Sequence, residues 1–193
     1  MLSRLFKSDI EKLKKALQKD DLKGFREILN RVGEANLSAE STPLVEASIK
    51  LSTPDFLEAL LQKLKITQTE TLLNYGLLAC TTDYPSKTLR VILREGLNKI
   101  SDDQLNQLSA FIVSNRKSDR MALLSLISQH GCSLNGANEA IKIAIQNEDK
   151  ELIKFLIESG VTLNEQSLKE ASEPFQSYAN RVVADKTLRD SWL

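Results

Sequence analysis

Apolar residues recur at helical spacing along this chain, in stripes that each stop shortly before a glycine. The clearest stripes are Leu89, Ile92 and Leu93; Leu123, Leu124 and Ile127; and Leu152, Phe155 and Leu156. Residues three and four positions apart share one face of an α-helix, so each stripe predicts an amphipathic helix. Gly96, Gly131 and Gly160 follow these stripes, and Gly33 follows a fourth. Because glycine adopts the left-handed conformation at little cost, we expect it to close the helix at each position.

A second set of helices is predicted upstream of the stripes by residues that favour helix starts. Ser8, Thr67 and Ser101 are each followed three residues later by Glu or Gln, the pattern of a capping box. Thr42 and Thr53 each precede a proline, which suits the first position of a helix. These signals place a first helix before each glycine-terminated second helix.

The two sets of helices combine into pairs, so the sequence predicts an all-α protein. The predicted pairs cover residues 8–33, 41–65, 69–96, 101–131 and 136–160. A C-terminal segment follows over residues 165–193. It begins like another first helix at 166–171, is broken by Pro174 and resumes with apolar residues at helical spacing from Tyr178. Gly96 and Gly131 are 35 residues apart and Gly131 and Gly160 are 29 apart, which brackets the roughly 33-residue period of some helical repeats.

Two of the recurring patterns resemble those of ankyrin repeats. Residues Thr42 to Ala47 are similar to the Thr-Pro-Leu-His-x-Ala start of such a repeat, with Val45 in place of His. Residues Leu126 to Asn135 are similar to its end, and Gly160 to Asn164 repeat that end. The resemblance implies a solenoid of about five ankyrin-like helix pairs, in which each pair covers the apolar face of its neighbour.

The resemblance also implies how the chain is organised. We expect a single ankyrin-like repeat domain over residues 1–193. Within it, residues 1–40 form an N-terminal capping pair, 41–164 form the ankyrin-like repeats, and 165–193 form an irregular C-terminal helical cap. Terminal units of a repeat stack are atypical because one of their sides faces water.

Proteins of this family bind other proteins, so the resemblance implies a partner-binding surface on the concave side. Four residues hold equivalent positions in the first helices: Glu46, Tyr75, Gln107 and Ile143. Tyr75 is the strongest contact candidate, because rigid aromatic side chains with a hydroxyl are enriched in interfaces. The alternative, that Tyr75 packs between neighbouring helices, stays open. Tyr84, in an inserted loop over residues 81–88, is a further partner-binding candidate, and Trp192 either contacts a partner or covers the last repeat.

Charge and composition argue against several other classes of protein. Lys and Arg together number 26, as do Asp and Glu, so no net positive charge attracts nucleic acid. Arg116, Lys117 and Arg120 form a local basic cluster around Asp119, which we interpret as a solvated helix face. No apolar run reaches the length of a membrane span, and the first residues do not form a secretory signal. With only two cysteines, a reducing compartment is expected.

Residue types that carry out chemistry are sparse. His130 and Cys132 flank the capping Gly131, and we interpret them as loop residues rather than as a nucleophile and its base. One His and two distant Cys do not provide a zinc site, so we expect no metal and no cofactor. Clustered carboxylates occur in the C-terminal segment, at Glu170, Glu173, Asp185 and Asp190.

We therefore predict a non-catalytic adaptor or inhibitor that binds one protein partner, acts as a monomer and is cytoplasmic. Two alternatives remain open. One is an enzyme, or an accessory domain of an enzyme, that uses the carboxylates of the C-terminal segment. The other is a bacterial effector that is delivered into a host cell and acts on a host protein.

Overall fold

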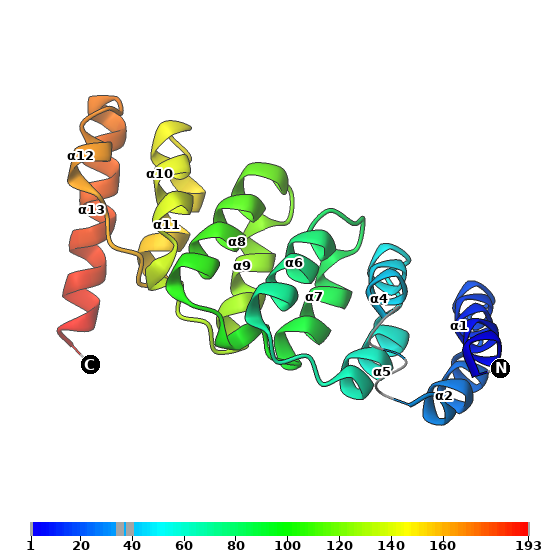
Figure 1. The fold of residues 1–193 in the computed structure, drawn as a ribbon. Coiled ribbons are helices and arrows are strands. Elements are labelled where there is room, and N and C mark those ends of the chain that lie inside the picture. The colour runs from blue at the N-terminus through cyan, green and yellow to red at the C-terminus, as the bar shows by residue number, and fades with distance from the viewer. Residues whose placement is uncertain (1, 34–36, 38–40, 193) are drawn as a thin grey trace. The chain divides into compact units, whose positions relative to one another are not determined.

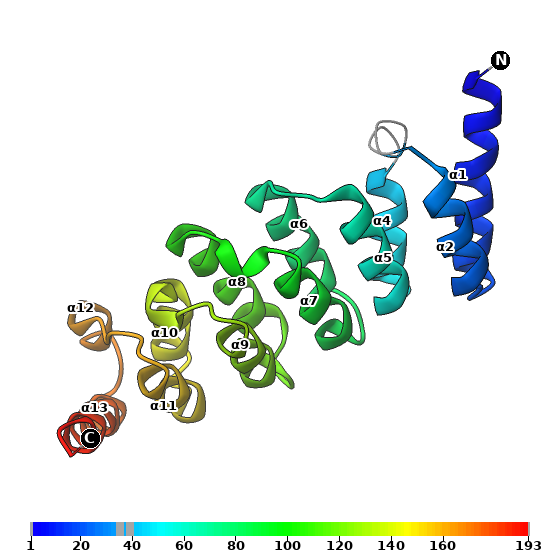
Figure 2. The same cartoon turned by 90° about the horizontal axis from the view of Figure 1, so that it is seen from below.

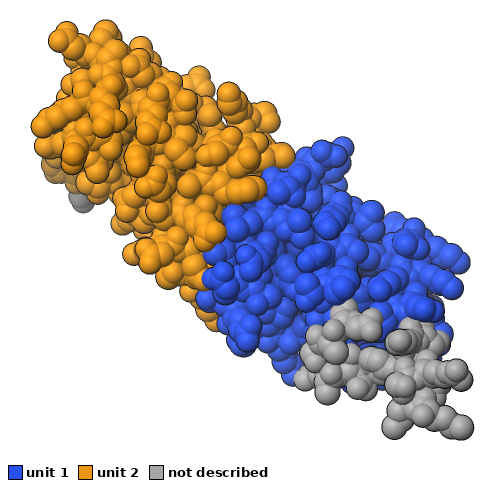
Figure 3. All heavy atoms as spheres, turned by 45° about the horizontal axis from the view of Figure 1, so that its top comes forward, with its two compact units in different colours: residues 1–98 blue, residues 99–193 orange. Residues whose placement is uncertain are grey.

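The structure is a computed structural model that describes the backbone of residues 2–33, 37 and 41–192, with side chains from Asp9 onward. Every regular element in these ranges is a helix, which confirms the predicted all-α class (Figure 1). The chain divides into two compact units, residues 1–98 and 99–193 (Figure 3). The expectation of a single repeat domain over the whole chain stays a prediction.

Among its described residues, unit 1 contains three helix pairs close to the predicted places. They are α1 (Leu2–Gln18) with α2 (Leu22–Arg31), α4 (Ser41–Lys50) with α5 (Pro54–Leu64), and α6 (Thr69–Ala79) with α7 (Pro85–Arg94). The first helices α1, α4 and α6 pack in one row, and the second helices α2, α5 and α7 pack in another (Figure 1). Phe25 of α2 and Phe56 of α5 meet edge to face, with ring centroids 5.0 Å apart, inside this core. The unit therefore has the arrangement of a helical repeat.

Unit 2 continues with three further pairs. They are α8 (Asp102–Asn115) with α9 (Arg120–Gln129), α10 (Asn138–Gln146) with α11 (Lys150–Glu158), and α12 (Glu165–Leu168) with α13 (Glu173–Asp190). The first helix α10 packs between α8 and α12, while α13 packs on α11 (Figure 2). Two short 3-10 turns, Leu97–Lys99 and Leu134–Gly136, follow α7 and α9.

Glycine closes three of the second helices, as predicted. Gly96, Gly131 and Gly160 have φ angles of +133°, +92° and +99°, which lie in the left-handed region. After Gly131 the Cys132 N–H donates to the Ile127 carbonyl, which satisfies one of the free carbonyls at the helix end. The prediction for Gly33 is wrong in its detail, because α2 ends with Val32 in an extended conformation.

The first helices end in a turn that the sequence did not reveal. Asp20, Ser52 and Glu148 follow α1, α4 and α10 with φ angles of +54°, +52° and +48°. In each turn the next residue donates its N–H to a carbonyl five positions back, as Thr53 does to Ser48 over 3.0 Å. That next residue is also the N-cap of the second helix, so one turn ends a helix and starts its partner.

The predicted helix starts are confirmed at two places. Ser101 and Gln104 form the capping box of α8, with hydrogen bonds of 3.3 and 3.1 Å in the two directions. Thr53 occupies the N-cap of α5 with Pro54 behind it, although its hydroxyl donates to the Ser48 carbonyl instead of capping the helix.

Other predicted starts are displaced. Ser8 lies inside α1, and Thr42 is the second residue of α4. The N-cap of α6 is Gln68 rather than Thr67. The predicted interruption of the C-terminal segment is present, since α12 ends at Leu168 and α13 begins at Glu173, but Pro174 occupies the first turn of the 18-residue α13 instead of preceding it. Proline suits that turn because its missing N–H would have no partner there in any case.

Candidate partner-binding surface

The predicted contact residues of the first helices differ in how much of each reaches the surface. In unit 1, Glu46 on α4 has a side chain that is 42% exposed and lies 3.8 Å from the ammonium of Lys50. In unit 2, Gln107 on α8 is exposed and Ile143 on α10 is half-buried. Glu46, Gln107 and Ile143 are therefore accessible to a partner.

Tyr75 is the exception, because only 5% of it is exposed. Burial raises the pKa of its phenol, a hydrogen bond with the Thr42 side chain lowers it, and the nearby Glu46 carboxylate raises it. Both of these groups belong to α4, while Tyr75 belongs to α6. The ring therefore packs against the neighbouring first helix, which is the alternative that the sequence left open.

Tyr84 lies at the surface of unit 1 with 62% of its area exposed. It precedes Pro85 at the N-cap position of α7, and the Lys87 ammonium lies 5.1 Å from the centre of its ring. The loop around it is shorter than predicted, since α6 ends at Ala79 and α7 begins at Pro85. The ring is therefore accessible, and one cation, Lys87, lies near its face.

Ile143 opens onto a pocket of about 590 Å³ in unit 2. The pocket lies between the end of α8, the start of α9 and the turn from α10 to α11. We call it the Ile143 pocket; it is lined by Val113, Ser114, Lys117, Arg120, Ile143, Ala144, Asn147, Asp149 and Leu152. Its wall thus combines aliphatic side chains with two basic residues and one acidic residue.

An ion pair between two repeats shapes one side of this pocket. The Nη2 of Arg120, the first residue of α9, donates to Oδ2 of Asp149. The other carboxylate oxygen of Asp149 accepts the Leu152 N–H over 3.0 Å and so caps α11. The side chains of Arg120 and Asp149 are only 18% and 19% exposed. The guanidinium is therefore held in place by a residue that is itself fixed.

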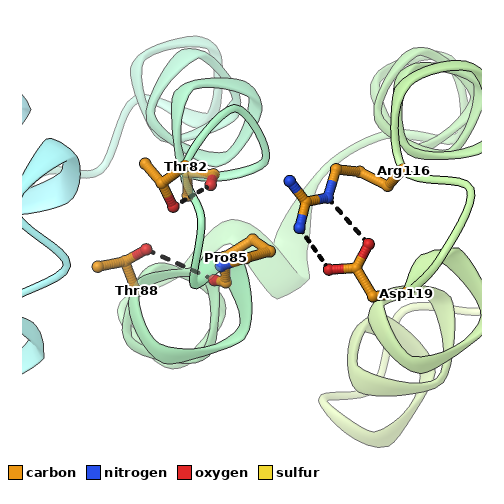
Figure 4. Close-up of polar contacts among 6 residues, drawn as sticks. Thr82, Pro85, Thr88, Arg116 and Asp119 are labelled. Atoms are coloured by element: carbon orange, nitrogen blue, oxygen red, sulfur yellow. Dashed lines mark hydrogen bonds and ion pairs between the residues drawn. The ribbon is translucent and has the colours of Figure 1, made fainter.

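A second arginine fixes the turn before α9. Arg116 donates to both carboxylate oxygens of Asp119, over 2.9 and 2.6 Å (Figure 4). This bidentate pair explains why Asp119, although it is the N-cap residue, makes no side-chain capping bond to α9. The interpretation of the basic cluster as a solvated helix face is therefore wrong for Arg116 and Arg120. Lys117 is exposed to solvent, but it lies in the turn between α8 and α9 and not on a helix.

Buried hydroxyls in unit 1 find partners within their own turns. Thr82 donates to the Ala79 carbonyl over 2.8 Å, and Thr88 donates to the Pro85 carbonyl over 3.5 Å (Figure 4). Local bonds of this kind let a polar side chain be buried beside a helix end without an unsatisfied donor. These two threonines thus belong to the packing of α6 and α7.

No protein-family model, no curated protein and no solved structure matches this chain. The ankyrin resemblance therefore stays a prediction, and the description of the surface depends on the geometry alone. In the described part of the chain, no helix combines the length and apolar character that a membrane span needs.

The residues considered for catalysis do not converge. Cys132 is 6% exposed, and burial raises the pKa of its thiol, which disfavours the thiolate that a nucleophile needs. His130 ends α9 on the other side of Gly131. Glu173 starts α13 and Asp185 lies three turns further on, about 18 Å along the helix axis. Among residues 9–33, 37 and 41–192, no three metal-binding side chains form a group that could hold an ion.

The end of α13 and the turn that follows it carry exposed apolar side chains. Leu188 is 60% exposed and Trp192 is 86% exposed. The alternative in which Trp192 folds back to cover the last repeat therefore does not describe this structure. The ring is accessible to a partner.

Proposed function

We propose that this protein is a non-catalytic adaptor or inhibitor, built from ankyrin-like helix pairs, that binds a protein partner. It binds through first-helix side chains and through the loops between repeats, as a monomer and without a cofactor. In this proposal the protein acts in the cytoplasm, and for a bacterial effector this is the cytoplasm of the host cell.

The observation that supports this proposal most directly is the row of first helices in each unit. In unit 1, α4 packs beside α6, and in unit 2, α8 packs beside α10. Glu46, Gln107 and Ile143, at equivalent positions of three of these helices, are accessible. Unit 2 therefore presents accessible side chains on two neighbouring first helices, Gln107 and Ile143, and unit 1 presents Glu46 on α4.

Polar contacts between successive repeats favour a rigid surface. The Asn106 side chain on α8 accepts the N–H of Glu139, 33 residues later, over 2.7 Å. In unit 1, Arg94 of α7 pairs with Glu58 of α5 over 2.7 Å. A surface that is ordered before binding loses less conformational entropy when the partner docks, which favours affinity.

The test is capture of partners with two variants that carry the same change in charge. The surface variant is Glu46→Lys with Gln107→Lys and Ile143→Lys. The control variant is Glu27→Lys with Ser128→Lys and Gln129→Lys, at exposed positions of the second helices α2 and α9. Tyr75 is left unchanged because its burial makes a substitution there disruptive.

We expect a protein that wild type and the control variant retain to be lost by the surface variant, with equal helicity of all three by circular dichroism. Retention of the same proteins by the two variants would contradict the proposed surface. Turnover of a substrate by purified wild-type protein would contradict the non-catalytic role.

A further inference from the structure

The Ile143 pocket carries more positive than negative charge. Lys117 and Arg120 contribute two cations to its wall, and Asp149 contributes one carboxylate. Because Asp149 already pairs with Arg120, the charge of Lys117 is left over. Lys117 is exposed, and no residue in the described part of the chain forms an ion pair with it. The pocket is therefore suited to a group with a single negative charge.

Arg120 has hydrogen-bonding capacity beyond its ion pair. A guanidinium carries five N–H donors on three nitrogens, and Asp149 accepts from Nη2. The Nε of Arg120 is buried, and no acceptor for it lies within the described residues. A buried donor without an acceptor costs about 1–3 kcal/mol, so an incoming acceptor that lets Arg120 adjust is favoured here.

The rest of the wall is apolar. Val113, Ala144 and Leu152 are almost completely buried, and Ile143 is the aliphatic side chain that is partly exposed. These groups lie in the same pocket as Lys117 and Arg120. An occupant that places an anionic group at the basic side therefore also brings its neighbouring atoms against Ile143.

We infer that the Ile143 pocket binds a protein segment in which an acidic side chain is next to an apolar one. The carboxylate lies against Lys117 and Arg120, and the apolar side chain covers Ile143. The inference rests on the proposed function and names the chemistry of the partner. A monoanionic carboxylate fits better than a phosphate dianion, because the Asp149 carboxylate in the same wall repels the second charge. A nucleic acid would need a row of unpaired cations to bind, and this pocket offers one.

The test uses the ¹⁵N-labelled full chain and small probes followed by NMR chemical shifts. The acidic probe is N-acetyl-glutamyl-leucinamide, and its neutral match is N-acetyl-glutaminyl-leucinamide. We expect the acidic probe to shift the backbone amide signals of Lys117, Ile143 and Asn147 in a saturable way at millimolar concentration. The neutral probe leaves those signals unchanged.

Two more probes test whether the pocket prefers an anion from another source, a chain terminus or a phosphate. N-acetyl-leucine carries a C-terminal carboxylate beside an apolar side chain, and inorganic phosphate is an anion without an apolar group. Stronger binding of N-acetyl-leucine than of the acidic probe would show that the pocket prefers the carboxylate of a chain terminus. That result would overturn the inference that it binds an acidic side chain. Equal chemical-shift changes with phosphate would overturn the claim that an apolar side chain of the partner contributes to binding at Ile143. Absence of shifts with the acidic probe would overturn it entirely.

Variants locate the binding. Lys117→Ala removes the unpaired cation and should weaken binding of the acidic probe about threefold, the range expected for an exposed ion pair. Lys142→Ala removes an exposed cation on α10 that does not line the pocket, and it should leave binding unchanged. Equal effects of the two variants would show a non-specific charge effect and overturn the inference.

This result is separable from the test of the proposed function. If the acidic probe fails but partner capture still depends on Glu46, Gln107 and Ile143, only the chemistry assigned to the pocket is wrong. If the probe binds while capture is insensitive to these residues, the pocket is a ligand site and the proposed surface is wrong.

Discussion

At the scale of single residues, residues in the left-handed conformation end both first and second helices in this protein. Glycines take the left-handed conformation after three of the second helices, and Asp20, Ser52 and Glu148 take it after three first helices. The glycine turns could be predicted, because glycine after an apolar stripe is a strong signal. The other turns could not, because Asp, Ser and Glu at these places resemble any polar helix end.

The left-handed conformation at Ser52 costs energy that glycine would not incur. The left-handed conformation destabilises a residue with a Cβ by about 1–2 kcal/mol, and glycine avoids this cost. Glycine also makes the unfolded chain more flexible, which offsets part of the stability gained. We expect Ser52→Gly to raise the free energy of unfolding by about 0.5–1 kcal/mol. Urea denaturation measures the change, and Ser52→Ala, which keeps the Cβ, is the control. A lower free energy of unfolding in Ser52→Gly would contradict the claim that Ser52 is strained in the left-handed conformation.

Two glycine turns should respond differently to the same substitution. A Cβ on Gly131 would meet no atom within 4 Å, whereas a Cβ on Gly160 would lie 2.4 Å from Oδ1 of Asn135. Gly131→Ala should therefore cost only the backbone strain, about 1–2 kcal/mol, and Gly160→Ala should cost slightly more, because the exposed Asn135 amide must turn away from the new Cβ. The difference should narrow when Asn135→Ala is added to both variants. Denaturant midpoints that fall equally in both single variants would contradict the steric contact.

Glu148 predicts a dependence on pH. The Ser172 backbone N–H and hydroxyl donate to its carboxylate over 2.7 and 2.9 Å, and these bonds, with a smaller effect of Lys150, lower the pKa of Glu148 despite slight desolvation. A lowered folded-state pKa means that the stabilisation is present above the unfolded-state pKa. It is lost as the pH falls through the folded-state value.

NMR titration of the Glu148 carboxyl carbon, in folded protein and in urea, measures both values. We expect the folded value to be the lower one, and Ser172→Ala to raise it part of the way because the backbone donor remains. Identical values in folded and unfolded protein would show that the contact does not form in solution.

At the scale of elements, a contact between two repeats caps the start of α10. The helix α10 lacks a side-chain cap from its own N-cap residue, Ala137. Asn106 of α8 instead accepts the Glu139 N–H in its first turn. Sequence patterns detect caps within a few residues, so a cap supplied 33 residues earlier could not be predicted.

Removal of this cap should therefore act as loss of an N-cap does. Asn106→Ala should lower the free energy of unfolding by about 1 kcal/mol, whereas Gln107→Ala, at the exposed neighbouring position, should change it by less than about 0.5 kcal/mol. Chemical denaturation of both variants provides the comparison. Equal effects would mean that Asn106 does not cap α10.

The sequence places the start of α13 too late. The expected interruption lies between α12 and α13, but Pro174 belongs to the first turn of α13 and not to the break before it. A proline that precedes a helix and a proline in its first turn can be told apart only when the helix start is known. No strong cap marks the start of α13, since Ser172 donates its hydroxyl to Glu148 instead of capping the helix.

At the scale of the whole molecule, the repeat pattern predicted the helix pairs but only part of the candidate surface. Glu46, Gln107 and Ile143 are accessible, and their role in binding stays a prediction. Tyr75 is buried against α4, since a large ring at such a position also fills the space beside the next helix. The Ile143 pocket could not be predicted, because Arg120 and Asp149 pair across 29 residues.

The central claim is that accessible first-helix side chains bind a protein partner. Its most direct measurement is the affinity of the captured partner for purified wild-type chain and for the Glu46→Lys, Gln107→Lys, Ile143→Lys variant, by isothermal titration calorimetry. We predict at least about a tenfold loss of affinity, equal to about 1.4 kcal/mol, in the surface variant and no loss in the charge-matched control. Unchanged affinity in a surface variant that keeps its helicity would contradict the account.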